Sequence, residues 1–492
     1  MTDETEGTTG AAAAGHRAAK NTATLAVGEI VGKVASFVLF AVLARKLGDA
    51  GLGVYVLAFA YLGIATMPVQ FGFGRHLLRK IAKDRTKVEQ MFDVMALQVC
   101  IAVPVTVASF AVLQLFGYDR EARLTIYVLM AGFLIDTVTQ TMHAVFLAFE
   151  RSELLATAVL SQRAAAAAMG LVALLLGFGI VAVAVTYTAS MALGAVLTTV
   201  LFGRAIGLPG LTLNPRAWKR LVGDSLPFAV QDVFSVLLYR VDTVILALLA
   251  TQAAVGHYGA AYRLLEATWF LPYAVVGSFA AMYAYLGNDT APTIQAVFQR
   301  SVKLVCVIMA PVAVLFGTLA DDLVRLLFGE ELAAAADPLR LLAPIVLLTG
   351  VIVLCSSLIV SRRSPRPLIV IAAATTVANI GLNLLLIPRY EDMGAALAML
   401  TTESLLVCVM LTFSALIVTG LDWVSMLASP LASGAGMVAV TLLLRDAPLL
   451  AGVVGVAVYV GLVIGLERVI SPVDLHFAGV MVRRLLPWQL AK

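Results

Sequence analysis

The chain has 492 residues, of which 61% are hydrophobic and 13% charged, and its formal net charge is +4. This composition excludes a water-soluble protein, because most of these residues cannot face water. The net charge says little until it is sorted by loop, and we expect no nucleic acid partner.

Long apolar runs recur almost from one end of the chain to the other. A helix needs roughly 20 apolar residues to span a bilayer. Backbone groups in lipid must pair within their own segment, so long runs predict helices, and the alternating pattern of a membrane barrel is not visible. We therefore predict an all-α polytopic membrane protein with about fourteen transmembrane helices. They are expected near residues 22–44, 51–72, 92–116, 123–149, 153–178, 180–202, 224–250, 254–287, 299–320, 337–361, 367–387, 392–417, 424–445 and 448–467.

An internal repeat links the two halves of the chain. The stretch Ser225–Leu286 matches the N-terminal stretch without a gap when Gly256 is placed on Gly53. In each copy the second apolar run is interrupted by a proline, Pro68 in the first and Pro272 in the second. Paired interrupted segments of this kind are typical of duplicated transporters and mark the central binding site.

The spans and the loops between them predict six parts and an orientation. With both termini in the cytoplasm, the inner loops collect about 22 Lys and Arg and the outer loops about 8, as the positive-inside rule requires. The location is therefore the cell membrane, crossed many times. The predicted parts are a disordered cytoplasmic tail (1–20), an N-lobe (21–203), a cytoplasmic inter-lobe linker (204–223), a C-lobe (224–418), two further helices (419–468) and a cytoplasmic amphipathic tail (469–492).

No segment predicts catalysis or nucleotide binding. The predicted loops are no longer than about 20 residues, which leaves no room for a soluble catalytic domain. The stretch Gly28–Val34 differs from a phosphate-binding loop by one residue of spacing and lacks the Ser or Thr. The four cysteines lie inside apolar runs without metal-ligand spacing. We expect no enzyme activity, no cofactor and no metal.

Eight short stretches spread over nearly the whole chain carry a resemblance to a known family. Together they resemble the polysaccharide-transport (Wzx-type) branch of the MOP exporter superfamily, whose members are flippases of lipid-linked oligosaccharides. The stretches are Leu43–Tyr55, Leu226–Phe228, Tyr239–Thr243, Val255–Arg263, Leu327–Glu331, Ala378–Asn383, Ile387–Tyr390 and Gly394–Leu397.

The resemblance implies two pseudosymmetric six-helix lobes, plus two C-terminal helices, around a V-shaped cavity. It also implies alternating access that moves an oligosaccharide on an undecaprenyl or dolichyl phosphate or diphosphate from the cytoplasmic to the outer leaflet. The partners would be this substrate, membrane lipids and glycan-assembly enzymes. A lipid II flippase and a cation-coupled multidrug-extrusion transporter of the same superfamily stay open as alternatives. A membrane glycosyltransferase or polymerase fits less well, because no acidic catalytic motif or long external loop is visible.

Ionisable residues at membrane depth are the candidate site residues, because each costs several kcal/mol there unless it is paired or functional. We expect Arg240 and Arg263 to form the centre of a headgroup site, since guanidinium groups bind phosphate in a bidentate way. Ion pairing within a lobe is the alternative interpretation. The substrate-binding candidates are Glu29, Lys33, Asp232, Arg240, Asp242, Arg263 and Glu266.

Three further groups of polar residues have a mainly structural interpretation. Asp136, Gln140 and His143 form one polar stripe on a helix, where Asp136 and His143 suit either ion or proton coupling or a packing network. Arg163 is expected to pair with a carboxylate across the lobe, with lining of the cavity as the alternative. The basic run Arg75–Lys87 is interpreted mainly as a topology signal on a surface-lying helix, with recruitment of an anionic headgroup as the minor alternative.

Overall fold

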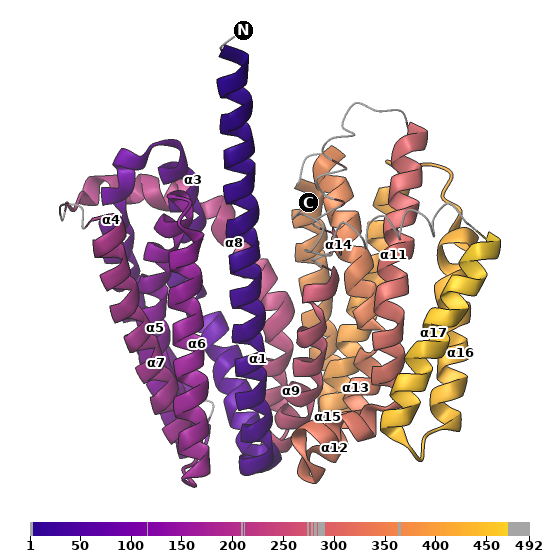
Figure 1. Cartoon of the computed structure of the whole chain (residues 1–492). Helices are drawn as coiled ribbons and strands as arrows, with labels where there is room; N and C mark the ends of the chain where they lie inside the picture. The colour runs from indigo at the N-terminus through magenta and orange to yellow at the C-terminus, as the bar shows by residue number, and fades with distance from the viewer. Residues whose placement is uncertain are drawn as a thin grey trace. The chain divides into compact units, whose positions relative to one another are not determined.

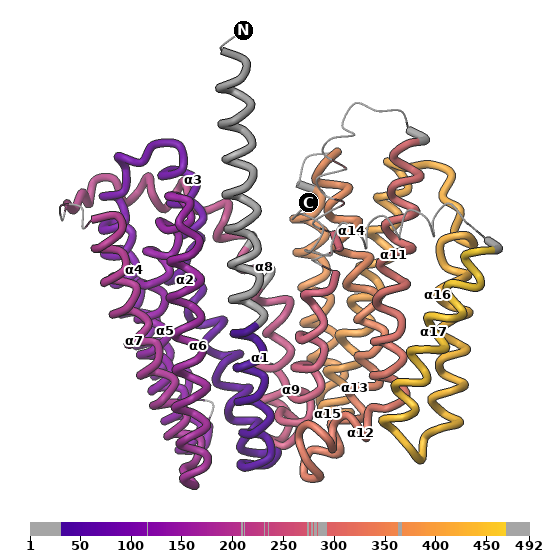
Figure 2. The backbone as a smooth tube through the Cα atoms, viewed as in Figure 1, coloured from indigo at the N-terminus to yellow at the C-terminus, as the bar shows by residue number. Residues whose placement is uncertain are grey.

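The structure is a computed structural model in which regular structure is helical throughout the part that it describes, as predicted (Figure 1). It describes residues 31–115, 117–207, 212–272, 291–362 and 366–470, with isolated positions at 210, 275, 276, 279 and 283. Within these ranges, side chains are described except at residues 231, 235, 291, 292, 366, 469 and 470. Figure 2 traces the described backbone in colour. The predicted tail 1–20 lies outside the described residues, as does the predicted tail 469–492 except for its first two residues, which end a helix.

The chain divides into two compact units, Met1–Leu248 and Leu249–Lys492. The linker predicted at 204–223 lies inside the first unit, and its last residues begin a long helix that continues to Leu249. The predicted division into lobes stays a prediction. Each unit is described by itself below.

The first unit is a bundle in which α1 packs on α5 and α6, and α7 packs on α5 and α6. The start of α8 joins this bundle, because Trp218 and Leu221 contact a cluster formed with Phe73 and Val94. Its helices are α1 (Asp3–Ala65), α2 (Met67–Gln70), α3 (Phe73–Lys83), the 3-10 turn η1 (Arg85–Glu89), α4 (Gln90–Leu115), α5 (Arg120–Ala148), α6 (Ser152–Leu175), α7 (Ile180–Ala205) and α8 (Pro215–Leu249).

The second unit packs α11 against α14 and α16, and α17 against α16. Tyr459 in α17 joins Ala310 and Met437 in a buried cluster, and its hydroxyl donates to the carbonyl of Val307, 3.0 Å away. The helices are α9 (Gln252–Thr268), α11 (Ala291–Thr318), α12 (Ala320–Phe328), the 3-10 turn η3 (Glu330–Ala335), α13 (Ala336–Leu342), α14 (Ile345–Arg362), α15 (Arg366–Ala415), α16 (Trp423–Leu443) and α17 (Pro448–Ile470).

The sequence repeat coincides with helix boundaries. The shift that places Gly256 on Gly53 also places Thr251, the N-cap of α9, on Gly48, where α1 is broken by a left-handed backbone (φ 66°). The same shift places Thr268, the last residue of α9, on Ala65, the last residue of α1. The two copies therefore share the position of the break and the position of the helix end.

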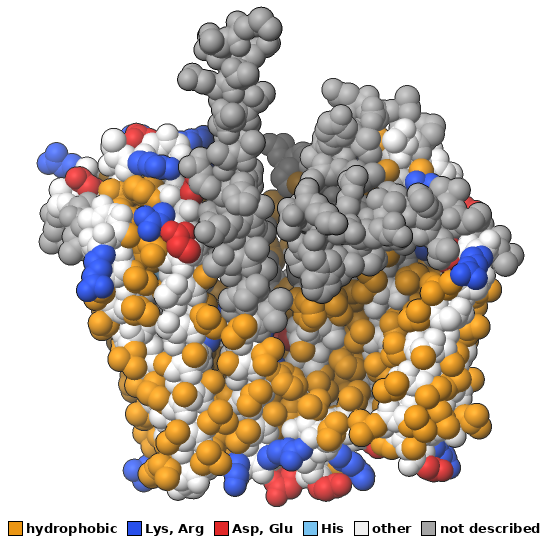
Figure 3. All heavy atoms as spheres, viewed as in Figure 1, with side chains coloured by type: hydrophobic (Ala, Val, Ile, Leu, Met, Phe, Trp, Pro, Cys, Tyr) orange, Lys and Arg blue, Asp and Glu red, His pale blue; other side chains and the backbone are white. Residues whose placement is uncertain are grey.

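Ten helices in the described ranges are long and apolar enough to cross a membrane. Two of them, Val31–Gln70 and Pro367–Ala415, have 40 and 49 residues and contain a break, at Gly48 and at Glu391. These breaks lie between the spans predicted at 22–44 and 51–72, and between those predicted at 367–387 and 392–417. In Figure 3, hydrophobic side chains cover the middle of the helices while charged side chains gather at their ends, which is the pattern of a bilayer belt.

A tight turn separates α2 from α3 and fixes where α3 begins. Phe71 and Gly72 both adopt left-handed backbone, with φ of 41° and 65°. A Cβ on Gly72 would lie 2.8 Å from the backbone nitrogen of Ala229 and 2.9 Å from the carbonyl carbon of Phe228. Glycine is therefore required here twice, for its conformation and for the close approach of α8.

The Gly72→Ala variant should lose more stability than a change that costs conformation alone. Gly117 is the matched control, because its φ is 68° and nothing lies within 4 Å of its Cβ position. Gly117→Ala should cost about 1–2 kcal/mol, whereas Gly72→Ala should cost about 1–3 kcal/mol more through the clash with α8. Thermal unfolding of the detergent-solubilised variants measures both. Equal melting temperatures would contradict the close packing of the α2–α3 turn on α8.

Candidate functional site

The first unit contains a polar cavity of about 270 Å³ between α2, α3, α4, α5 and α8. Amide, hydroxyl and charged side chains make up much of its wall, which is unusual within a bundle whose outer surface is apolar. A concave site with a few convergent polar groups is a candidate ligand-binding site. The lining residues are Met67, Gln70, Gly72, Gly74, Arg75, Gln98, Thr137, Gln140, Thr141, Asp232 and Val236.

The charged part of this cavity is an ion pair between Arg75 and Asp232. The guanidinium also donates to the carbonyl oxygen of Phe228 at 2.9 Å and lies over the Phe228 ring at 5.5 Å. Arg75 stands in the first turn of α3, directly after the Gly72 turn, so the packing of that turn on α8 brings the two side chains together. The side chains are 40% and 44% exposed, so an incoming anion can reach the guanidinium.

Hydrogen bonds fix the amides and hydroxyls around the pair. Thr141 donates to the side-chain oxygen of Gln98 at 3.0 Å, and Gln140 donates to Asp136 at 2.6 Å. Gln162 on α6 approaches the other oxygen of Asp136 at 3.4 Å. Asp136 and Gln140 of the predicted stripe thus interact directly.

His143, the third residue of that stripe, is buried and contacts the Thr198 hydroxyl on α7 at 3.2 Å. Asp136 and His143 therefore belong to two hydrogen-bonded groups on the same helix. Their proposed role in ion or proton coupling stays a prediction.

The candidates on α1 and α8 lie in different surroundings. Glu29 is outside the described residues, and Lys33 is exposed. A Cβ on Gly32 would come within 2.6 Å of Arg163 Cδ, so the Arg163 side chain on α6 crosses α1 at this glycine. The carboxylate that we predicted for Arg163 stays a prediction.

On α8, Arg240 is partly buried, and its Cγ lies 3.8 Å from the Cβ position of Gly63. Asp242 is only 1% exposed and accepts from the backbone nitrogen of Thr243 at 2.6 Å. Asp232, by contrast, lines the polar cavity with Arg75.

In the second unit, Arg263 and Glu266 form an ion pair at 3.3 Å on α9. Their side chains are 31% and 16% exposed, which leaves the guanidinium accessible. His257, six residues earlier on α9, lies 3.6 Å from Asp392 of α15. The expected convergence of Arg263 with Arg240 concerns both units and stays a prediction.

Arg75 lines the cavity, but the sequence analysis did not include it among the substrate-binding candidates. It opens a basic run, so its charge was interpreted as a topology signal on the membrane surface. Leu77 and Ile81 of the same helix are fully buried, so α3 is indeed amphipathic. The available signal was the Phe71–Gly74 sequence before Arg75, since glycines at such a turn bring a backbone close to its neighbours.

The sequence analysis also missed one ion pair and one buried carboxylate in the second unit. Lys303 on α11 and Glu467 on α17 form an ion pair at 2.7 Å, with side chains 7% and 6% exposed. Glu403 on α15 is 4% exposed. The rule that ionisable residues within spans are candidates would have found all three.

The comparisons with known proteins decide the family. The model of the family described as polysaccharide biosynthesis protein matches residues 18–280, which is more than half of the chain and includes the whole polar cavity. The chain belongs to this polysaccharide biosynthesis family.

The chain is 25% identical, over 390 residues, to the probable low-salt glycan biosynthesis flippase Agl15 of Haloferax volcanii. That match covers 77% of this chain and 80% of the relative. The predicted resemblance to Wzx-type flippases is thus confirmed. The family is one of membrane transporters that cross the bilayer many times, not of catalysts.

Two solved structures share the fold of the family member at low identity. The lipid II flippase MurJ, in an inward closed conformation, superposes with a TM-score of 0.74 and 12% identity, over 90% of this chain and 98% of MurJ. An inward-facing multidrug resistance MATE transporter of the MOP superfamily gives 0.65 and 14% identity, over 78% of this chain and 94% of the transporter. The fold is therefore that of the MOP superfamily.

The Lys303–Glu467 pair could serve either the stability of the second unit or transport, and two variants distinguish these roles. Removing one partner leaves a buried charge uncompensated, so Lys303→Leu should cost about 3–5 kcal/mol of stability. The double variant Lys303→Leu, Glu467→Leu should recover most of that loss, since two apolar side chains replace the pair. Thermal unfolding, with transport measured on the same samples, tests this. A stable double variant that has lost transport would move the pair from the scaffold to the transport machinery.

Proposed function

We propose that this chain is a flippase for a lipid-linked oligosaccharide in surface polysaccharide or glycan biosynthesis. The carrier would be an undecaprenyl or dolichyl phosphate or diphosphate, moved from the cytoplasmic to the outer leaflet by alternating access. One observation carries the proposal: a member of a polysaccharide biosynthesis family has an accessible arginine–aspartate pair on a polar cavity inside its membrane bundle.

The chemistry of the pair suits a phosphate headgroup. A guanidinium stays charged when partly dehydrated and offers a planar fork of donors to phosphate oxygens. Asp232 holds Arg75 in place while the cavity is empty, and an arriving phosphate competes for the same donors. Because the pair is 40% and 44% exposed, it contributes only about 0–1 kcal/mol, so the exchange costs little.

The Arg263–Glu266 pair in the second unit has the same design. Each unit would thus offer the headgroup one accessible arginine beside a carboxylate. Binding and release at these arginines make or break no bond in the substrate, so the proposed function includes no enzymatic step.

We propose fourteen transmembrane helices, in two pseudosymmetric lobes of six plus two C-terminal helices, with both termini cytoplasmic. The ten candidate spans become twelve when Val31–Gln70 and Pro367–Ala415 are divided at their breaks. The remaining two would be α8 and the segment that begins with α9, which the repeat pairs with the two halves of α1. The repeat and the prolines Pro68 and Pro272 support rocking of the lobes, because prolines weaken helices locally.

The lipid II flippase alternative shares both the fold and the type of carrier, so the sugar specificity decides between them. The name of the relative, a probable glycan biosynthesis flippase, favours an oligosaccharide. The multidrug alternative is less favoured because arginines with accessible guanidinium groups suit an anionic substrate better than a cationic drug.

Arg75→Ala should reduce transport at least tenfold while the stability falls by only about 1 kcal/mol or less. Arg75→Lys should retain part of the activity, because an ammonium lacks the planar fork. The control is Arg151→Ala: its pair with Glu153 is similarly exposed, at 44% and 47%, and lies outside the cavity. Transport of a lipid-linked oligosaccharide into the outer leaflet is measured in cells that lack their own flippase. Equal activity of the Arg75 and Arg151 variants would exclude a headgroup role for Arg75.

Arg240 is tested by a double change. If Arg240 binds the headgroup, Arg240→Ala should abolish transport although the protein still inserts, and Arg240→Lys should rescue it only in part. If Arg240 only neutralises Asp242, which is 1% exposed, the double variant Arg240→Leu, Asp242→Leu should be fully active. Complementation together with the expression level distinguishes these outcomes. Arg263→Ala, compared with Glu266→Ala, extends the same test to the second unit.

A further inference from the structure

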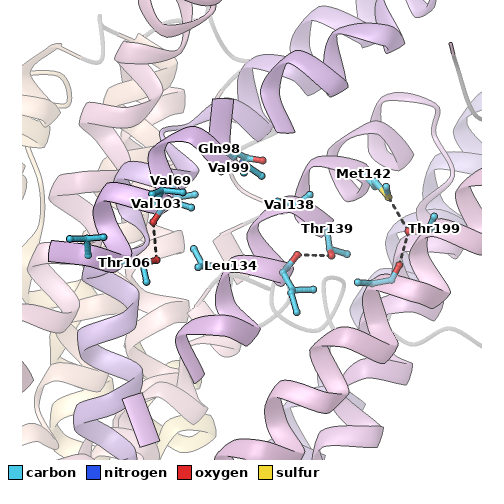
Figure 4. A pocket seen from close by; sticks show the side chains of 14 residues that line it. Val69, Gln98, Val99, Val103, Thr106, Leu134, Val138, Thr139, Met142 and Thr199 are labelled. Atoms are coloured by element: carbon cyan, nitrogen blue, oxygen red, sulfur yellow. Dashed lines mark hydrogen bonds between the residues drawn. The ribbon is translucent and has the colours of Figure 1, made fainter. Parts of the chain in front are cut away.

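An apolar groove of about 630 Å³ lies in the first unit between α4, α5 and α7 (Figure 4). Figure 4 shows Val69, Val103 and Thr106 on one side and Met142 and Thr199 on the other. The four-residue spacing of Val99, Val103 and Val107 places them in one row along α4, where each is more than half exposed. In a membrane such a row faces hydrocarbon, so the groove is open to lipid chains.

The groove shares a wall with the polar cavity. Gln98, which is 3% exposed, lines both spaces, and Thr141 holds its side-chain oxygen at 3.0 Å. Helix α5 presents Thr137 and Thr141 to the polar cavity, and Leu134 and Val138 to the groove. The two spaces therefore lie next to each other, with one amide side chain at their junction.

We propose that this groove holds the isoprenoid chain of the substrate whose phosphate pairs with Arg75. The inference rests on the proposed function and adds to it the path of the carrier lipid through the first unit. Charge and polarity carry the argument: a cation stands in the polar space, the adjoining space is almost wholly apolar, and the occupant that matches both is a single amphiphilic anion.

The groove positions the chain more than it attracts it. A chain that moves from bilayer to groove exchanges one hydrocarbon environment for another, so the hydrophobic effect contributes little. What the groove supplies is packing along the chain, which raises the effective concentration of the phosphate near Arg75. Filling the groove should therefore raise the substrate concentration needed for half-maximal binding, without altering the cavity that holds the phosphate.

The test fills the groove with Val103→Trp and compares it with Val196→Trp. The two valines are 61% and 62% exposed, and Val196 lies on α7 outside the groove lining, so the pair is matched in exposure. Each full-length variant is reconstituted into phosphatidylcholine liposomes and photolabelled with a polyprenyl phosphate that carries a diazirine on its chain. We expect labelled peptides from α4 and α5, a loss of that label of at least fivefold in Val103→Trp, and wild-type labelling in Val196→Trp. Arg75→Ala should lower the labelling of α4 and α5 as well, because the phosphate is no longer bound next to the groove.

Three results would overturn the proposal. Both tryptophan variants could label like the wild type, both could lose label equally, or a diazirine phosphatidic acid could label the groove and resist displacement by excess polyprenyl phosphate. The last result would assign the groove to ordinary bilayer lipid. Transport of a lipid-linked oligosaccharide, measured on the same liposomes, distinguishes a failure of the proposed chain path from a failure of the proposed function. Active transport without groove labelling would defeat the chain path alone, whereas an inactive wild type would defeat the proposed function.

Discussion

The bilayer interior contains no water to bind an unpaired polar group, and the described structure follows from that constraint. Backbone groups can be satisfied there only within helices or closed barrels, and the long apolar runs of this chain fold as helices. Charged side chains face the same demand, and Lys303 with Glu467 meets it inside the second unit. Arg75 and Asp232 are paired as well, but they are left accessible on a polar cavity. Because the pair is accessible, a substrate phosphate can replace Asp232 as the partner of Arg75.

The position of the cavity depends on breaks in the helices. The turn at Phe71 and Gly72 ends α2 and starts α3, and the missing side chain of Gly72 lets α8 approach closely. Arg75 then follows on the first turn of α3, within reach of Asp232. The breaks at Gly48 and before Thr251 fall at equivalent positions of the sequence repeat. The turn at Gly72 thus brings a charged side chain of α3 next to a carboxylate of α8.

The local pattern of the sequence was sufficient for the all-helical fold class and the family, and the site was only partly accessible from it. Apolar runs, the repeat and the short family motifs predicted the helices, the break near Gly48 and the family, because each depends on residues close together in the chain or on a resemblance. Asp232 was recognised because a carboxylate inside a span is costly wherever it lies. Its partner was not, since Arg75 is far away in the sequence and only the packing of α3 on α8 brings them together. Lys303 and Glu467 show the same limit, because their pairing joins α11 to α17.

A reconstituted flipping assay tests most directly whether the chain moves an anionic glycolipid across the membrane. Purified protein is placed in phosphatidylcholine liposomes with a polyprenyl diphosphate oligosaccharide whose sugar carries a fluorophore, and an impermeant reductant bleaches the outer leaflet. We expect nearly all glycolipid fluorescence to be bleached in liposomes with the wild-type protein, while fluorescent phosphatidylcholine in the inner leaflet of the same liposomes stays protected. Protection of the glycolipid equal to that in protein-free liposomes would contradict this expectation.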